Sequence, residues 1–380
     1  ICQIAFSLLL VTTALLFVVS FQNLLHADLG FQTQQVVAAD FDLSALKIPV
    51  ANRLAVKQNL LQRVRTLPGV ADAAEAAIVP LSGNGWNDFI DIPATSVKRA
   101  LSDFNAVSSD YFRTLEIPLL AGRTFADSDT VQSVPVALVN QAFAERFFGT
   151  EDPVGKTFIL RRGANAGTTY EVIGVVGNNK ENDVREPFSP VVFLDLDQDA
   201  SPDLDETIVL RTADPANVIA ALRRTAAAVS PGVVLQASIL RGDIARRLGR
   251  ERLMAELSGF YGALAALLAA VGLYGMMSWM VSRRRNEIGL RVALGASRNG
   301  VLGMIVREAF ALLGAGVITG ILLVFAAGYA IRAMLFDLKP TSPLMLAIAA
   351  AGMTIVTIAA SLIPARGALG VQPMEVLREE

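Results

Sequence analysis

Residues 257–281 read LSGFYGALAALLAAVGLYGMMSWMV and contain no Asp, Glu, Lys or Arg. The hydrocarbon core of a bilayer is about 30 Å thick, so a helix that crosses it needs about 20 apolar residues. Lipid offers the backbone no hydrogen-bond partners, which makes a helix the expected structure for such a run. The alternative is a buried helix of a water-soluble protein, but such apolar runs typically extend over only about 10–14 residues. The stretch therefore predicts a transmembrane helix.

Three further runs are equally free of charged side chains, namely residues 1–27, 309–331 and 340–365. The chain of 380 residues is 53% hydrophobic and only 18% charged, which also favours a membrane protein. The first run is an alternative candidate for a signal peptide, but it exceeds the usual apolar core of about 7–15 residues and shows no basic leader. Because the sequence begins with Ile1 rather than Met, we expect residues upstream of it. We predict four transmembrane helices.

Arginine is unevenly distributed among the segments that connect these runs. The segment 282–308 contains six arginines, at positions 283, 284, 285, 291, 298 and 307, against one Arg and one Lys between the third and fourth runs. Short loops rich in Lys and Arg stay in the cytoplasm, so we expect this segment, the N-terminus and the tail 366–380 to be cytoplasmic. Residues 28–256 then lie outside. Five arginines just before residue 257 do not fit this pattern, but the rule weakens for long translocated domains.

Residues 28–256 alternate strand-like and helix-like stretches, which predicts a folded α/β domain of two lobes. Two similar strand-helix-strand (βαβ) units are visible, and we interpret them as an internal repeat. The first has a strand at 35–43, a helix at 52–67 and a strand at 70–79, and the second has a strand at 207–211, a helix at 216–229 and a strand at 233–237. In both units a Pro-Gly pair separates the helix from the second strand.

The stretch between the two units predicts shorter elements. We expect helices at 110–115 and 141–148, a strand at 134–139, and strands at 156–161, 170–176 and 191–194 in a small β-rich portion. A helix over 244–257 is expected to continue into the second transmembrane helix as a stalk. Outside the membrane, therefore, the sequence predicts an extracytoplasmic α/β domain linked by a helical stalk.

The predicted transmembrane runs are rich in Gly and Ala, including Gly316 and Gly320 at small-xxx-small spacing. Small residues let helices approach closely in lipid, so we expect helix pairing or dimerisation. No ionisable side chain lies within the runs, whereas ion channels and proton-coupled carriers normally place such groups there. The formal net charge of −2 also provides no basic field for nucleic acid.

Sites for metals and catalysis have little support. One histidine, His26, and one cysteine, Cys2, make a His/Cys zinc site or a His-based triad improbable. The stretch 149–157 has the glycines of a phosphate loop, but with five residues between them instead of four and with a proline in the loop. Asp195, Asp197, Asp199 and Glu206 match four positions of a calcium loop, but Ala200 replaces the required glycine. We predict a turn in the first case and a solvated acidic loop in the second, with no catalytic residue, metal or cofactor on this chain.

Several stretches together resemble one family. EIGLRVALGAS at 287–297, PAR at 364–366 and QPMEVLREE at 372–380 are similar to the FtsX/MacB superfamily of ABC transporter permeases. LPGV at 67–70, SSDYFRTLEIPLLAGRTF at 108–125 and FFGTEDPVGKTF at 147–158 are similar to the periplasmic core domain of its MacB-like members. The resemblance covers nearly the whole chain, and its layout of four spans with a large domain after the first matches the topology above.

The resemblance implies a permease of the bacterial inner membrane that pairs with a second permease unit and with a cytoplasmic ABC ATPase, where ATP is bound and hydrolysed. It also implies that ATPase motion is transmitted to the periplasmic domain to drive export, with a periplasmic adaptor as a further partner. The residues expected to contact the ATPase form a cytoplasmic elbow, and they are Glu287, Ile288, Gly289, Arg291, Leu294 and Gly295. The fused nucleotide-binding domain of MacB is missing from this sequence, and the start at Ile1 fits the second half of a longer duplicated permease.

Two other functions remain open at the level of sequence. An FtsX-like subunit would regulate a periplasmic cell-wall hydrolase without transporting anything, and an outward-facing receptor would need no ATPase at all. A neighbouring gene for an ATPase, an adaptor or a hydrolase would separate these possibilities. Nothing in the sequence names a substrate.

Overall fold

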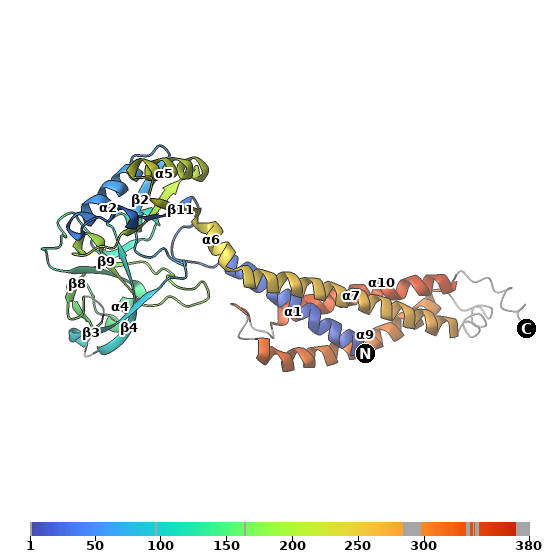
Figure 1. The fold of residues 1–380 in the computed structure, drawn as a ribbon. Helices are drawn as coiled ribbons and strands as arrows, with labels where there is room; N and C mark the ends of the chain where they lie inside the picture. The colour runs from blue at the N-terminus through green and yellow to red at the C-terminus, as the bar shows by residue number, and fades with distance from the viewer. Residues whose placement is uncertain are drawn as a thin grey trace, which may run out of the picture. The chain divides into compact units, whose positions relative to one another are not determined.

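The structure is a computed structural model that describes residues 2–95, 97–162, 165–283, 298–331, 335, 336, 338 and 342–369. Two compact units are distinguished, one formed by Ile1–His26 with Leu248–Glu380 and the other by Ala27–Arg247. We call the first the helical unit and the second the α/β unit (Figure 1). The α/β unit is thus inserted between the first and second helices of the helical unit.

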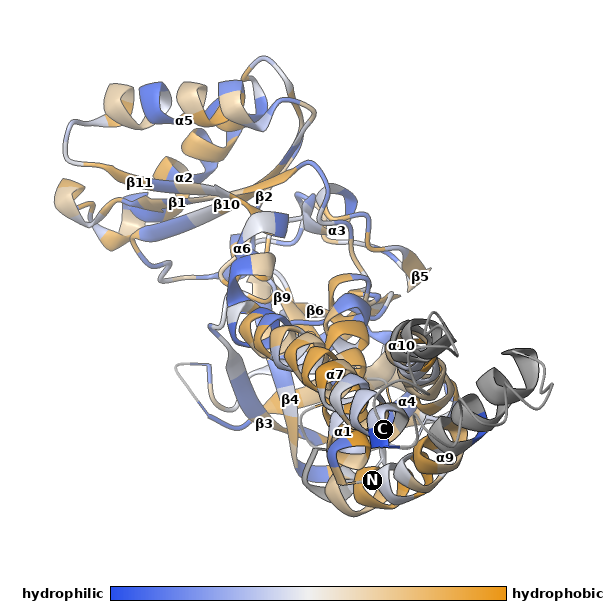
Figure 2. Ribbon diagram, turned by 90° about the vertical axis from the view of Figure 1, so that its right-hand side faces the viewer, coloured by the Kyte–Doolittle hydropathy of each residue, from blue (hydrophilic) through white to orange (hydrophobic). Residues whose placement is uncertain are grey.

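The helical unit consists of long apolar helices, as the sequence predicts. They are α1 (Cys2–Leu25), α7 (Gly249–Arg283), α9 (Arg298–Ile331) and α10 (Pro343–Leu369). Within the described residues, four stretches are long and apolar enough to cross a membrane: Cys2–Leu25, Gly249–Met280, Phe310–Gly328 and Pro343–Ser361. Hydrophobic residues predominate along α1, α7 and α9 (Figure 2). Helix α1 contacts the other three, and Leu8 is fully buried in their shared core.

One lobe of the α/β unit is an antiparallel four-stranded sheet in the order β11-β1-β10-β2. Its elements are β1 (Val36–Asp42), η1 (Ser44–Leu46), α2 (Val50–Arg65), β2 (Val70–Glu75), β10 (Asp205–Thr212), α5 (Pro215–Val229) and β11 (Val234–Ile239). Helices α2 and α5 cover the same face, because their buried side chains share one core with alternate residues of β1 and β10. Strands β1 and β2 run parallel to each other with β10 between them, and β10 and β11 run parallel with β1 between them. This is a split βαβ arrangement. This topology does not by itself test the predicted internal repeat.

The second lobe is a seven-stranded sheet that is inserted between β2 and β10. Its order is β5-β8-β6-β9-β4-β3-β7, and a further pairing of β7 with β8 closes it on itself. The elements are β3 (Trp86–Ile92), η2 (Pro93–Thr95), β4 (Val97–Val107), α3 (Tyr111–Thr114), β5 (Leu119–Gly122), β6 (Val136–Asn140), α4 (Gln141–Phe148), β7 (Thr157–Leu160), β8 (Thr169–Val176), β9 (Val191–Asp195) and η3 (Leu196–Gln198). The hydrophobic core of this lobe includes three phenylalanines of α4, namely Phe143, Phe147 and Phe148.

The prediction of a small β-rich portion missed three of these strands, β3, β4 and β5. In β3 the residues that alternate with Phe89 point inward, and one of them is the buried Asp88. In β4 the inward positions include Ala100 and Ser102. Small and polar residues at these positions weaken the hydrophobic alternation by which a strand is recognised. The interior of the lobe is completed by aromatic residues from elsewhere, such as Phe158.

Two predicted elements differ from the structure at their boundaries. The strand expected to reach residue 79 ends at Glu75, after which Asn105 of β4 binds the backbone of Ile78 through both its N–H and its C=O. The expected stalk helix over 244–257 is interrupted. Helix α6 (Leu240–Arg247) ends before Leu248, where the two units divide, and α7 begins one residue later.

Candidate functional site

The residues predicted to contact an ATPase lie outside the described part of the chain. This holds for Glu287, Ile288, Gly289, Arg291, Leu294 and Gly295 alike. The described helices on either side of them are α7, which ends at Arg283, and α9, which begins at Arg298. The elbow assignment therefore stays a prediction. The part of the described structure that bears on it is the packing of α7 against α1.

Helices α1 and α7 are joined by hydrogen bonds from side chains to backbone. The side-chain amide of Gln3 donates to the carbonyl of Leu268 at 2.6 Å, and the hydroxyl of Ser7 donates to the carbonyl of Ala265 at 3.0 Å. One step of four residues along α1 matches three residues backward along α7, so the helices run antiparallel. Such bonds contribute on average about 0.6 kcal/mol each between helices in lipid. They fix the register of the pair.

Glycines let the helices of this unit approach closely. A Cβ atom added to Gly262 of α7 would lie 2.7 Å from the Cβ of Ala14, and one added to Gly320 of α9 would lie 2.8 Å from Leu8. Both distances are shorter than a van der Waals contact, so a larger residue would force the helices apart. Gly320, one of the two glycines at small-xxx-small spacing, thus packs against α1 within the chain.

Helix α7 carries an exposed apolar stripe along one side. Its members recur at steps of four and three residues, the spacing of a coiled-coil seam: Leu253, Leu257, Phe260, Leu264, Leu267, Val271 and Tyr274. We call this set the α7 stripe. The helix is 35 residues long, or about 52 Å at about 1.5 Å per residue, which exceeds the bilayer core of about 30 Å.

The acidic stretch of the α/β unit differs from the solvated loop that was expected. Asp195 is 5% exposed and accepts the backbone N–H of Asp197, so it caps the short helix η3, while Asp199 accepts the N–H of Ser201. Burial raises the pKa of Asp195 to about 7. Glu206 lies on β10 and is 1% exposed. Within the described residues no group of three or more potential ligands gathers as a metal site requires.

Glu206 belongs to a buried cluster of charged residues that also includes Lys57 of α2 and Glu75 of β2. Lys57 of α2 forms an ion pair with Glu75 at 2.5 Å and donates to the carbonyl of Asp205 at 3.1 Å. Both carboxylate oxygens of Glu206 lack a hydrogen-bond partner among the described residues. Burial raises the pKa of Glu206 to about 9, and the nearby charge of Glu75 adds to the effect. Glu206 is therefore protonated at neutral pH.

The stretch 149–157 forms a turn between α4 and β7. Gly149 follows α4 with φ +64, and Gly155 has φ +79 and donates its N–H to the carbonyl of Val172 at 2.8 Å. Lys156 donates its N–H to Pro153, which closes the turn just before β7. This geometry is the helix-to-strand turn predicted from the sequence.

Comparison with known families matches the chain in two parts. The model of the MacB-like periplasmic core domain matches residues 2–228, and the model of the FtsX-like permease C-terminal region matches residues 259–373. The chain is a MacB/FtsX-like ABC transporter permease. The order of the two matches agrees with an α/β unit inserted after the first helix of this permease.

Two of the curated relatives are export proteins with an ATP-binding part, and another is the uncharacterized ABC transporter permease YknZ of Bacillus subtilis. This permease is 25% identical over 287 residues to the macrolide export ATP-binding/permease protein MacB of Neisseria gonorrhoeae, covering 72% of this chain and 43% of that protein. It is 28% identical over 280 residues to the pyoverdine export ATP-binding/permease protein PvdT of Pseudomonas syringae pv. tomato, covering 69% and 40%. The chain thus spans less than half the length of these two export proteins.

Among solved structures, the periplasmic region of MacB from Actinobacillus actinomycetemcomitans matches 58% of this permease and 94% of that chain, with 13% identity and a TM-score of 0.38.

The sequence did not single out the polar residues that join α1 and α7. The available signal was Gln3 and Ser7, two polar residues four apart in an otherwise apolar run. Their partners are backbone carbonyls of a helix far along the chain, which no local pattern indicates.

Proposed function

We propose that this permease transmits motion of a cytoplasmic ABC ATPase subunit across the membrane to its α/β unit, and so drives export. Two relatives support the proposal, because MacB and PvdT are named as export proteins with an ATP-binding part. ATP would be bound by the partner subunit. We expect the helical unit to lie in a bacterial inner membrane, with both termini in the cytoplasm and the α/β unit in the periplasm.

The packing of α1 against α7 is the observation that carries the mechanism. Chain connections at residues 26–27 and 247–248 join the α/β unit to these two helices. Because contacts of Gln3, Ser7 and Gly262 hold the pair in register, we expect the two helices to move together. A force applied near Arg283 at the end of α7 would then reach both attachments of the α/β unit.

Transmission requires an ATPase that binds two states of the permease with different free energies. We assign that contact to the elbow between α7 and α9, with Glu287, Ile288, Gly289, Arg291, Leu294 and Gly295 as its residues. A second permease unit would provide the matching half of the transporter, and a periplasmic adaptor would receive the motion of the α/β unit.

The test is a complex of the whole permease with its ATPase in lipid nanodiscs. Glu287→Ala and Arg291→Ala are expected to abolish ATP-dependent movement of spin labels on the α/β unit while the thermal unfolding midpoint stays unchanged. Arg224→Ala, a change at an exposed arginine of α5, should leave the movement intact. Full movement in both elbow variants would refute the elbow assignment.

The same preparation separates export from signalling. Reconstituted into vesicles with its adaptor, an exporter accumulates or releases a substrate in an ATP-dependent manner. An FtsX-like signalling subunit would show ATP-dependent movement of the α/β unit and activation of a cell-wall hydrolase, with no transported molecule. The second outcome would replace the export proposal.

A further inference from the structure

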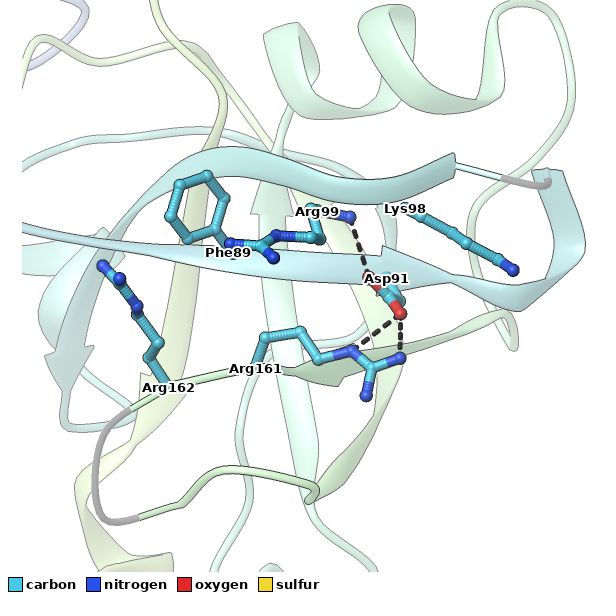
Figure 3. Close-up of a pocket in the computed structure, with 6 residues that line it drawn as sticks. All are labelled: Phe89, Asp91, Lys98, Arg99, Arg161 and Arg162. Carbon is cyan, nitrogen blue, oxygen red and sulfur yellow. Dashed lines mark hydrogen bonds and ion pairs between the residues drawn. The ribbon is translucent and has the colours of Figure 1, made fainter.

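A basic pocket lies on the outer surface of the seven-stranded lobe, where β3 ends, β4 begins and β7 ends. It has a volume of about 390 Å³ and is lined by Phe89, Asp91, Lys98, Arg99, Arg161 and Arg162 (Figure 3). Of these described residues, four are cations and one is an anion. The pocket therefore has a net charge of +3, although the chain as a whole is slightly acidic.

Asp91 organises two of the arginines. One carboxylate oxygen accepts the backbone N–H of Arg99 at 2.8 Å, and the other accepts the guanidinium of Arg161, whose Nε lies at 2.7 Å (Figure 3). The hydrogen bonds from Arg161 lower the pKa of the Asp91 carboxyl, so it stays ionised. Asp91 thus neutralises Arg161 and positions the strand that carries Arg99.

The backbone at Arg99 is held in an unfavourable conformation. Its φ of +52 lies in the left-handed region, which residues other than glycine rarely adopt. The pairing of β3 with β4 is irregular at this place, between Ile90 and Ile92. Strain of this kind persists where surrounding contacts impose it and is common at binding sites. Here the conformation coincides with the irregular pairing, and the backbone N–H of Arg99 donates to Asp91.

Phe89 gathers two positive charges around one ring. The guanidinium carbon of Arg99 lies 5.5 Å from the ring centroid, and that of Arg162 lies 5.2 Å from it. Cation-π attraction contributes only about 0.5–1 kcal/mol at exposed sites, while two like charges brought together repel each other. Within the described part of the chain, Arg161 forms an ion pair with Asp91. The guanidinium groups of Arg99 and Arg162 and the ammonium of Lys98 form no ion pair with a described carboxylate. An anion between them would relieve the repulsion.

We propose that this pocket binds a multivalent phosphate-bearing anion. Guanidinium groups match phosphate oxygens in geometry and donate several hydrogen bonds at once. Lys98 adds a third positive charge to those of Arg99 and Arg162. The cavity is open to solvent and has room for a small ligand such as a diphosphate, or for the headgroup of an acidic lipid. Both sources present the same chemistry to Arg99 and Arg162.

The experiment measures binding to the whole permease in nanodiscs of neutral lipid. Inorganic pyrophosphate is titrated in by calorimetry, and vesicles that contain phosphatidic acid are tested by co-sedimentation. We expect saturable binding at one site, weakened about tenfold by Arg99→Gln or Arg162→Gln and further weakened by added salt. Phe89→Leu is expected to reduce affinity less, because it removes the ring but none of the charges.

Arg146→Gln is the matched control. Arg146 lies on α4, is exposed, and has its guanidinium 5.4 Å from the ring of Phe147, so it shares the stacking but lies outside the pocket. Pyrophosphate binding that depends on Arg99 and Arg162 supports a soluble anion, and vesicle binding with the same dependence but without pyrophosphate binding supports a lipid headgroup. No saturable binding of either probe, or equal binding in the pocket variants, the Arg146 variant and the unaltered permease, would overturn the proposal. Unfolding midpoints confirm that each variant is folded.

Discussion

Glu206 links the stability of the α/β unit to pH. Burial raises the pKa of the Glu206 carboxyl to about 9 in the folded state, whereas its ordinary pKa is 4.5. Between these two pH values the folded state keeps a proton that the unfolded state has lost. The stabilising effect of this proton is complete below 4.5 and is lost as pH rises through about 9. We expect Glu206→Gln, which has no proton to lose, to raise the unfolding midpoint by about 5 °C at pH 8 and by little at pH 4.5. Calorimetry at both values checks this; an equal gain from Asp203→Asn, a change at an exposed carboxylate, would contradict it.

At the scale of elements, the contact between α1 and α7 depends on one glycine. A Cβ at position 262 would lie 2.7 Å from that of Ala14, and neither atom can move without its helix. Gly262→Ala should therefore destabilise the helical unit by about 1–3 kcal/mol, the usual cost of overpacking. Gly259→Ala in the same helix meets nothing within 4 Å and should be neutral or slightly stabilising. Thermal unfolding in detergent compares the two variants, and equal midpoints would show that the close approach contributes nothing.

For the whole molecule, the α7 stripe offers a surface for the proposed second permease unit. Leu264 lies at its middle and is exposed, and its spacing from its neighbours suits a parallel helix pair. In a Cys2→Ser background, Leu264→Cys is expected to cross-link two copies in native membranes under mild oxidation. Met276→Cys, exposed on another side of α7, is the control and should cross-link poorly. Comparable dimer bands for both would mean that lipid alone covers the stripe.

Local patterns were sufficient for much of this fold. Freedom from charge predicted the transmembrane helices, because lipid excludes charged side chains wherever they occur in a span. Pro-Gly pairs predicted where the two helices of the four-stranded lobe end. Strands β3 and β4 were missed because buried Asp88 and Ser102 break the alternation. The elbow residues, which are the predicted functional site, stay a prediction.

Charge-free runs and short motifs were enough to predict a membrane protein with a large α/β domain after its first span, and to indicate its permease family. Three features became visible only once distant segments had packed together: Gln3 donates to Leu268, Glu206 is buried beside Glu75, and Arg99 of β4 and Arg162, two residues after β7, converge on Phe89. The reason is physical. Hydrophobicity and chain-breaking residues act over a few neighbours, whereas the burial of a charge or the convergence of several charges depends on which distant segments pack together.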